Sequence, residues 1–369
     1  MIKKSISVLL SVIMIFGVFT IIPFPAFAAI SGTTGDCTWT LNGTVLTISG
    51  NGAMGDYQAN CGPWGDDITR VTINKGVTHI GESAFTDCTN LTRVTISDTV
   101  TSIGKCAFFA CLKLASVTIP DSVTDLGSSA FSCCDELKSV TIGNSVTSIN
   151  DAFSFCYSLT SVVIPDSVKS IDWYAFSNCG ELKSVTFGGA VERIGYGAFS
   201  NCQKLTSIII PDSVTEIGYT AFSGCSGLSD ITFPDYVTEI SPDAFDDTAW
   251  YNNQPDGVVY AGKVAYKYKG TCPSEVEIRE GTLSINYNLF RDCTQLQTVT
   301  IPDSVTNIGV AAFYQCTGLL NVAIPDSVTS INQHCFYGCT VLTEVVIPDT
   351  VTIIDDYAFC ECKGLTVTA

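Results

Sequence analysis

The chain has 369 residues, 18 cysteines and a formal net charge of −18 at pH 7, and 46% of its residues are hydrophobic. The hydrophobic content and the positive mean hydropathy argue against an intrinsically disordered chain. A surface this acidic repels phosphate backbones and anionic lipids, which argues against nucleic acid and direct membrane docking as partners.

Residues 1–28 have the features of a secretory signal peptide. Lys3 and Lys4 precede a mostly apolar run, and Ala26 and Ala28 frame a small-x-small cleavage site. The apolar run is short for a membrane span, and no later stretch is long and apolar enough to cross a bilayer. We therefore expect cleavage after Ala28 and a mature chain that is secreted or held at the cell surface, without a transmembrane segment.

Residues 29–65 are expected to form an N-terminal β cap. Threonine alternates with apolar residues on both sides of Asn42-Gly43, a dipeptide typical of two-residue hairpin turns. A cap would shield the open strand edge of the first coil, which repeat arrays need for solubility.

The rest of the chain is a tandem repeat built around phenylalanine. Ala-Phe recurs every 23 residues, with one step of 22 and one of 45, and leucine follows every repeat phenylalanine except Phe245 by six residues. Apolar and polar residues then alternate before a Pro-Asp-Ser turn, which predicts one short strand per coil. This pattern predicts a leucine-rich-repeat solenoid, a right-handed curved rod with a β-strand and a short irregular or helical turn in each coil. The phenylalanines predicted to stack in a buried spine are Phe85, Phe108, Phe131, Phe153, Phe176, Phe199, Phe222, Phe245, Phe290, Phe313, Phe336 and Phe359.

The 45-residue step divides the array into coils at 66–249, an inserted hairpin-like segment at 250–273 and coils at 274–369. The insertion is expected to protrude as a hairpin and concentrates lysines and aromatic residues. It is interpreted either as a decoration that patches a gap in the array or as a ligand-contact loop. The chain stops partway through a strand, which favours a fragment or a frayed end. The aromatic candidates for ligand contact are Trp250, Tyr251, Tyr260, Tyr266 and Tyr268.

The repeat unit resembles that of a known family. Its consensus is Leu-x-x-Val-x-Ile-Pro-Asp-Ser-Val-Thr-x-Ile-Gly-x-x-Ala-Phe-x-x-Cys-x-x-Leu, and it is similar to the repeat of BspA-type leucine-rich-repeat proteins over about residues 66–369. Residues 37–54 are similar to the cap that precedes those repeats. The resemblance implies a bacterial surface or secreted protein. It also implies a role in adhesion, which in this family includes binding of host matrix proteins and of other bacteria.

Eleven cysteines occupy the position three residues after a spine phenylalanine. Equivalent positions on stacked coils are about 4.8 Å apart, more than the Cβ separation of about 3.8 Å in a disulfide. We therefore expect a ladder of small buried side chains rather than disulfides. Cys37 and Cys61 bracket the cap and either pair or stay reduced. The ladder positions are Cys88, Cys111, Cys134, Cys156, Cys179, Cys202, Cys225, Cys293, Cys316, Cys339 and Cys362.

No catalytic, cofactor or metal constellation is expected. The chain has two histidines, His79 and His334, in coils far apart, so neither completes a nucleophile–base pair. The aspartates recur in register after proline, which favours turn capping over acid–base catalysis. The paired cysteines at 133–134 and 360–362 point to opposite faces of a ladder and make weak metal ligands. The sequence predicts a non-enzymatic protein.

The outward strand positions are mostly threonine and serine, either as soluble β-formers or as a binding face. Apolar exceptions on such a face indicate protein contact, and exposed turn aromatics are common binding anchors. We expect a protein ligand, such as a host matrix or microbial surface protein. The alternatives are a glycan-binding or structural cell-wall component, or an accessory module of a larger exported protein. The candidate residues are Val163, Ile209 and Val346 on the strands, and Trp173 and Tyr174 on a turn.

Overall fold

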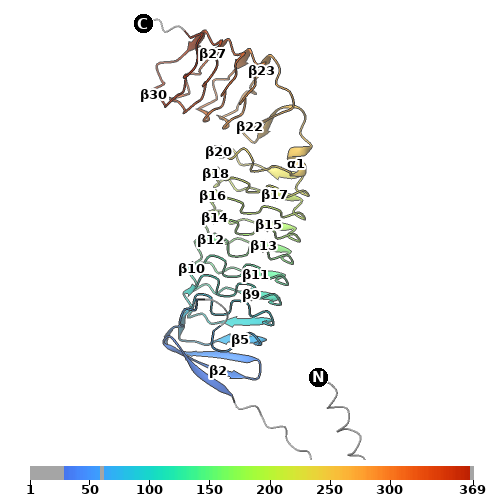
Figure 1. Ribbon diagram of the computed structural model, residues 1–369, viewed down its shortest axis with the longest axis vertical. Coiled ribbons are helices and arrows are strands. Elements are labelled where there is room, and N and C mark those ends of the chain that lie inside the picture. Colours follow the sequence, from blue (N-terminus) through green and yellow to red (C-terminus); the bar gives the residue numbers. More distant parts are fainter. Residues whose placement is uncertain (1–28, 59–61, 366–369) are drawn as a thin grey trace, which may run out of the picture.

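In a computed structural model, which describes residues 29–58 and 62–365, the chain winds into an elongated β-solenoid (Figure 1). Each coil gives one strand to each of two parallel ladders that run along the rod. The predicted solenoid is therefore confirmed. Each coil also has a second, short strand, which was not predicted from the sequence. The predicted signal peptide lies outside the described residues.

The cap is a three-stranded antiparallel sheet joined to the array. The Asn42-Gly43 turn joins β2 (Cys37–Asn42) to β3 (Val45–Gly50), with Gly43 at a φ of +61°. Strand β1 (Ile30–Thr34) pairs with β2 on the outer side. Strand β3 pairs in parallel with β5, the first strand of the array. The cap thus covers the edge that the first coil would otherwise expose.

The first ladder holds the strands predicted from the apolar alternation. In β9 and β11, Val117 pairs with Val140 beneath the outward pair Thr118 and Thr141. Register is fixed because a slip by one residue would bring valine to the surface. Its strands are β5 (Arg70–Ile73), β7 (Arg93–Ile96), β9 (Ser116–Thr118), β11 (Ser139–Thr141), β13 (Ser161–Val163), β15 (Ser184–Thr186), β17 (Ser207–Ile209), β19 (Asp230–Thr232), β23 (Glu275–Glu277), β25 (Thr298–Thr300), β27 (Asn321–Ala323) and β29 (Glu344–Val346).

The second ladder follows the Pro-Asp-Ser turn and buries the isoleucine of each Ile-Gly pair. Its strands in the cap and first block are β4 (Gly52–Ala53), β6 (Val77–Ile80), β8 (Ser102–Ile103), β10 (Asp125–Leu126), β12 (Ser148–Asn150), β14 (Ser170–Asp172), β16 (Arg193–Ile194), β18 (Glu216–Ile217) and β20 (Glu239–Ile240). Those of the second block are β24 (Ser284–Ile285), β26 (Asn307–Ile308), β28 (Ser330–Ile331) and β30 (Ile353–Ile354).

The turn that carries Ala-Phe is not helical, and part of its backbone hydrogen bonds run from one coil to the next. The N–H groups of Cys106, Phe108 and Ala110 donate to carbonyls of the next coil at 2.8–3.0 Å. The residues between them bond within their own coil. This alternation places the first and last of the three in the left-handed region, with φ of 53° and 56°. That conformation costs a non-glycine residue about 1–2 kcal/mol, which the inter-coil hydrogen bonds offset.

The phenylalanines form a continuous stack in each block. Those from Phe85 to Phe336 are fully buried, and neighbouring rings such as Phe199 and Phe222 stack at 5.5 Å. Phe359, in the last coil, is only half-buried and stacks on Phe336 at 5.3 Å. Trp64, which was not predicted as a spine residue, stacks on Phe85 at 5.2 Å and begins the spine.

The ladder cysteines have a second role besides filling space. The Cys202 thiol donates to the Phe176 carbonyl of the preceding coil at 3.2 Å, and the same contact recurs along both blocks. One expectation is wrong: Cys293 is bonded to Cys272 in a disulfide with a Cα separation of 5.6 Å. Cys272 lies in the insertion, outside the 23-residue register, so the spacing argument did not apply to it. Cys37 is a buried thiol, and Cys61 lies outside the described residues.

The insertion joins the two blocks and does not protrude. It consists of α1 (Ala249–Asn252), β21 (Gly257–Ala261) and β22 (Val264–Lys269). Strands β21 and β22 form a hairpin, and β22 then pairs in parallel with β24, so the hairpin becomes the first layer of the second block. The rod bends here, and the second block leans toward the side on which β20 lies (Figure 1).

Candidate functional site

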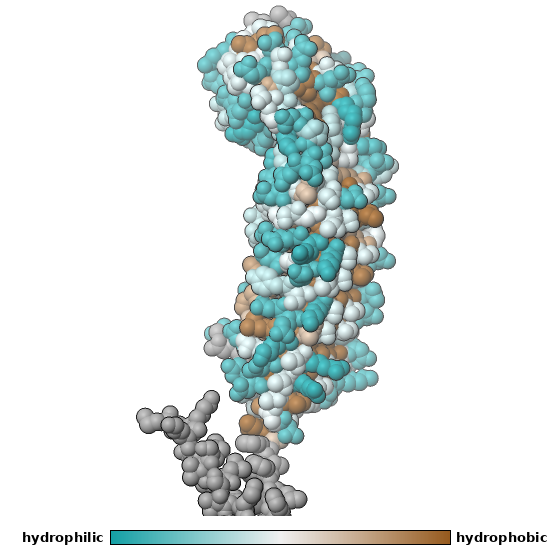
Figure 2. Space-filling model, turned by 90° about the vertical axis from the view of Figure 1, so that its right-hand side faces the viewer, coloured by the Kyte–Doolittle hydropathy of each residue, from teal (hydrophilic) through white to brown (hydrophobic). Residues whose placement is uncertain are grey.

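The apolar candidates on the first ladder are exposed but scattered. Val163, Ile209 and Val346 are 63%, 71% and 55% exposed. Strand β15 separates the first two, and the third lies in the other block, so the structure does not bring them together. Ile209 borders a shallow hollow with Phe187 and Pro211. Figure 2, which faces this side of the rod, shows hydrophobic residues as separate patches on a mostly polar surface.

The turn aromatics, by contrast, gather into one surface. Trp173 stacks on Tyr196 of the next coil at 5.8 Å, and Tyr174 meets Tyr196 edge to face at 5.1 Å. Tyr219 occupies the same turn position one coil further on and is 53% exposed. We name Trp173, Tyr174, Tyr196 and Tyr219 the aromatic strip. Its rings present a large exposed surface and cost little conformational entropy to immobilise.

Backbone geometry explains why the strip is exposed. Trp173 and Tyr174 have φ of 36° and 60°, which turns both rings away from the spine. The Tyr174 ring lies over Gly197, where an added Cβ would come within 2.4 Å of the ring. Gly197 also has a φ of +60°, so glycine is required there for both reasons. A hydrogen bond with the Tyr196 phenol raises the pKa of Tyr174, so the Tyr174 phenol is a neutral hydrogen-bonding group at neutral pH.

The insertion aromatics are placed differently from the prediction. Tyr266 was predicted to contact a ligand, but its side chain is fully buried against Phe245, so this residue is corrected to a core position. Trp250 and Tyr251 are partly buried against the same core. Tyr268 packs on Phe290 at 5.8 Å, again in the core of the second block.

Tyr260 is held by Arg279. The Tyr260 phenolic oxygen accepts a hydrogen bond from the backbone N–H of Arg279 at 2.9 Å. The Arg279 guanidinium lies 4.2 Å from the centre of the Tyr260 ring. Among the five aromatic candidates of the insertion, then, one is buried, three are packed against a core, and Tyr260 is engaged by a neighbouring cation.

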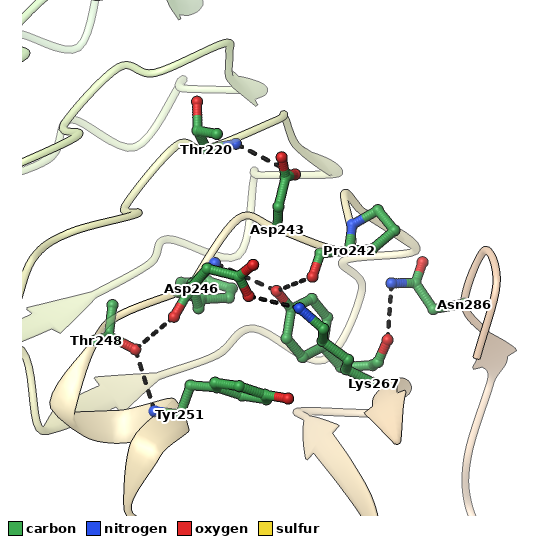
Figure 3. Close-up of polar contacts among 10 residues, drawn as sticks. Thr220, Pro242, Asp243, Asp246, Thr248, Tyr251, Lys267 and Asn286 are labelled. Atoms are coloured by element: carbon green, nitrogen blue, oxygen red, sulfur yellow. Dashed lines mark hydrogen bonds and ion pairs between the residues drawn. The ribbon is translucent and has the colours of Figure 1, made fainter. Parts of the chain in front are cut away.

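The lysines of the insertion are also used internally. Lys263 and Lys267 form ion pairs with Asp235 and Asp246, at 3.3 and 2.6 Å. Lys269 donates to the carbonyls of Asn252 and Gln254 at the end of α1, at 2.7 and 2.6 Å. Figure 3 shows the Lys267 contact beside the Thr248 hydroxyl that caps α1. These contacts tie the insertion to the first block and support the interpretation that it patches the array.

Sequence reasoning missed part of the aromatic surface. Tyr196 and Tyr219 repeat the turn position of Trp173 at intervals of one coil, and aligning the repeats would have shown it. A second group lies in the other block, where His334 stacks on Tyr357 at 5.2 Å. Tyr314 stacks there on Tyr337 at 5.0 Å and lies under the Arg291 guanidinium.

The polar groups suggested by the sequence take structural roles. The Asp121 carboxylate accepts from the Asn144 N–H of the next coil at 2.9 Å, as expected for turn capping. His79 contacts the Ser102 hydroxyl at 2.7 Å and lies 3.6 Å from Asp56. Within residues 29–58 and 62–365, no group of three His, Cys, Asp or Glu side chains is placed to hold a metal ion. No helix in the described part of the chain is long and apolar enough to cross a membrane.

The stacked coils, the buried spine and the open outer surfaces define a leucine-rich-repeat solenoid, a class of scaffold that presents binding surfaces. The chain belongs to the BspA-type leucine-rich-repeat family, whose model matches residues 64–156, 150–254 and 262–368. Each match spans several coils, and together they cover almost the whole array.

The chain is also similar to solved structures of bacterial leucine-rich proteins. A leucine-rich cell surface protein of Faecalibacterium prausnitzii is 30% identical, with 91% of this chain and 93% of that chain covered and a TM-score of 0.46. A leucine-rich-repeat protein of Bacteroides ovatus is 25% identical, with 91% of each chain covered and a TM-score of 0.49. No curated protein is similar to the chain at a significant level.

Proposed function

We propose that this protein is exported to the cell surface and acts as an adhesion protein, and that it binds a protein ligand through the aromatic strip. The observation that carries the proposal is the cluster of Trp173, Tyr174 and Tyr196, which are 59%, 40% and 39% exposed and already in contact with one another. Rigid exposed tryptophan and tyrosine side chains are the residues that most often dominate protein interfaces.

Family membership and the cell-surface relative from Faecalibacterium support the surface location. The sequence features of residues 1–28 support export. The glycan alternative would gain support if the insertion aromatics together lined a groove. Trp250, Tyr251 and Tyr266 instead pack against the core, and Tyr268 lines a hollow to which no second aromatic ring of the described residues contributes. A protein ligand is therefore the better proposal.

The test compares two double variants of the mature chain, from residue 29 onward. Trp173→Ala/Tyr196→Ala removes the centre of the aromatic strip, and Val163→Thr/Ile209→Thr changes the first ladder of the same block. Binding is measured to immobilised extracellular matrix proteins and to a polysaccharide array. We expect the strip variant to weaken binding to a matrix protein by at least about tenfold, while the ladder variant retains it.

Two results would contradict the proposal. Binding that is lost in the ladder variant but kept in the strip variant would move the site to the strands. Binding confined to the polysaccharide array would favour the glycan alternative. Circular dichroism and the melting temperature check that both variants are folded, as expected for exposed substitutions.

A further inference from the structure

A half-open cleft of about 400 Å³ lies at the junction of the two blocks. One wall comes from Glu216, Tyr219 and Glu239 on the last coils of the first block, and the other from Tyr287 and Val310 of the second block. The second ladder is interrupted here, because β20 ends one sheet and β22 belongs to the next. The bend brings the second block over this gap (Figure 1).

Two carboxylates face the cleft without a cation. Glu216 and Glu239 are in register on the parallel strands β18 and β20, so their side chains leave the same face about 5 Å apart. Like charges in such a pair destabilise a sheet. Arg193 is in register with Glu216, but its guanidinium lies on Asp172 at 2.9 Å. Within residues 29–58 and 62–365, neither glutamate has an ion-pair partner.

A serine hydroxyl also lines the cleft. Ser241 lines the cleft and is 8% exposed, and among the described residues no hydrogen bond reaches its Oγ. Half of the coils have glycine at this position, as in Gly195 and Gly218, where an added Cβ would meet the preceding coil. A ligand with several donors would satisfy this oxygen and the carboxylates together.

The aromatic rings indicate which kind of cation fits. Tyr219 and Tyr287 enter the cleft from opposite blocks, and Val310 adds an apolar wall. Burial, and then the charge of Glu239, raise the pKa of the Tyr287 phenol, so the ring stays neutral at physiological pH. An inorganic divalent ion needs more carboxylate or carbonyl ligands than two. A planar organic cation can instead stack on tyrosine while it donates to carboxylates and a hydroxyl.

We propose that the junction cleft binds a guanidinium group, the side chain of an arginine in a basic segment of the protein partner. Glu216 and Glu239 accept its N–H donors, Ser241 accepts a further one, and Tyr219 and Tyr287 flank its plane. The source of the arginine rests on the proposed function, because Tyr219 is both the end of the aromatic strip and a wall of the cleft. The proposal therefore predicts that the segment of the partner that lies next to the bend of the rod carries an arginine.

The test uses small probes, so that it does not depend on adhesion. Acetyl-Gly-Arg-Gly-amide is titrated into the mature chain and followed by calorimetry, beside the same peptide with citrulline, the neutral isostere of arginine. The cleft variant is Glu216→Gln/Glu239→Gln. Its control, Glu136→Gln/Glu181→Gln, makes the same change in net charge at two exposed glutamates outside the cleft. A third variant, Ser241→Ala, tests the hydroxyl alone.

We expect the arginine peptide to bind at least about tenfold more tightly than the citrulline peptide, and the cleft variant to lose that preference while the charge control keeps it. Ser241→Ala should weaken binding by a smaller factor. The cleft variant should melt no lower than wild type, because it removes a like-charge pair. Equal binding of the two peptides, equal loss in both double variants, or no binding at millimolar peptide would overturn the proposal.

Failure of this site and failure of the proposed function are distinguishable. If the arginine preference holds but Trp173→Ala/Tyr196→Ala still binds matrix proteins, the cleft stands without the aromatic strip. If the strip variant abolishes adhesion but the two peptides bind alike, the strip stands and the cleft assignment is wrong.

Discussion

A regular coil and the junction coil provide different hydrogen-bond partners for the backbone N–H of the spine phenylalanine. In a regular coil, the Phe222 N–H donates to the Ala244 carbonyl of the next turn at 2.8 Å. At the junction no such alanine follows Phe245, and its N–H donates instead to the phenolic oxygen of Tyr266 at 3.2 Å. That hydroxyl in turn donates to the Pro242 carbonyl at 2.7 Å. Repetition supplies partners automatically, whereas an interruption needs a dedicated side chain for each group.

The same contrast holds for packing. Rings of the first block stack almost parallel, as in Phe222 and Phe245 with an interplanar angle of 2°. At the junction Tyr266 meets Phe245 at 76°, and Trp250 adds a second edge contact at 5.2 Å. Each regular coil can be replaced in principle by its neighbour. The junction cannot, because its contacts occur once.

The sharpest way to test this contrast is to remove the junction. Replacing residues 252–269 with a short flexible bridge deletes β21 and β22 and leaves a core surface open on both blocks. We expect the single unfolding transition to be replaced by two, or the first block to lose more than about 4 kcal/mol. Thermal unfolding followed by circular dichroism measures this. A single transition at the wild-type temperature would show that the insertion is only a decoration.

Within the regular coils, the largest single effect is expected at the middle of the spine. Phe199→Ala should lower the free energy of unfolding by about 3–5 kcal/mol, because it leaves a cavity between two stacked rings. Phe359→Ala, at the half-buried last ring, is the matched control and should cost clearly less. Urea denaturation of both variants gives the comparison. Equal losses would mean that burial by stacking does not set the stability.

A milder change isolates the substitute hydrogen bond at the junction. Tyr266→Phe keeps the ring but leaves the Phe245 N–H and the Pro242 carbonyl without this partner, and should cost about 1–3 kcal/mol. Tyr236→Phe, at a tyrosine that is 68% exposed, should change the unfolding free energy by less than about 0.5 kcal/mol. A Tyr266→Phe protein as stable as wild type would show that the bond is dispensable.

The smallest effect concerns the thiol ladder and pH. Burial raises the pKa of Cys179 to about 12, from an ordinary value near 9. The folded chain therefore keeps this thiol neutral, and stability from its burial is present below about pH 9 and falls as the pH rises toward 12. The free energy of unfolding, measured by urea denaturation, should fall between pH 8 and pH 10 by about 1 kcal/mol less in Cys179→Ala than in wild type. An identical fall in both proteins would contradict this role.

Much of this molecule could be predicted from the sequence because it repeats. The 23-residue spacing determined the solenoid, and strand alternation determined which valines and isoleucines face inward. The spine followed from phase alone, since residues at equal positions in stacked coils must lie above one another. The second ladder was missed because two-residue strands such as β18 carry too few residues to show a period.

Where the repeat is broken, the exposure predicted for side chains of the insertion was wrong. Tyr266 and Lys267 alternate in a plausible surface hairpin, and only the parallel pairing of β22 with β24 turns one of them into the core. Cys272 likewise had no register from which to predict its bond to Cys293.

The sequence by itself determined the coil, its spine and the positions of its turns, because identical neighbours impose identical surroundings. Only the tertiary structure decided where the rod bends, which aromatic rings meet on its surface and which carboxylates face a cleft. Those features depend on residues that no period relates and that the fold brings to one place, such as Glu239 and Tyr287, which line the same cleft at the junction.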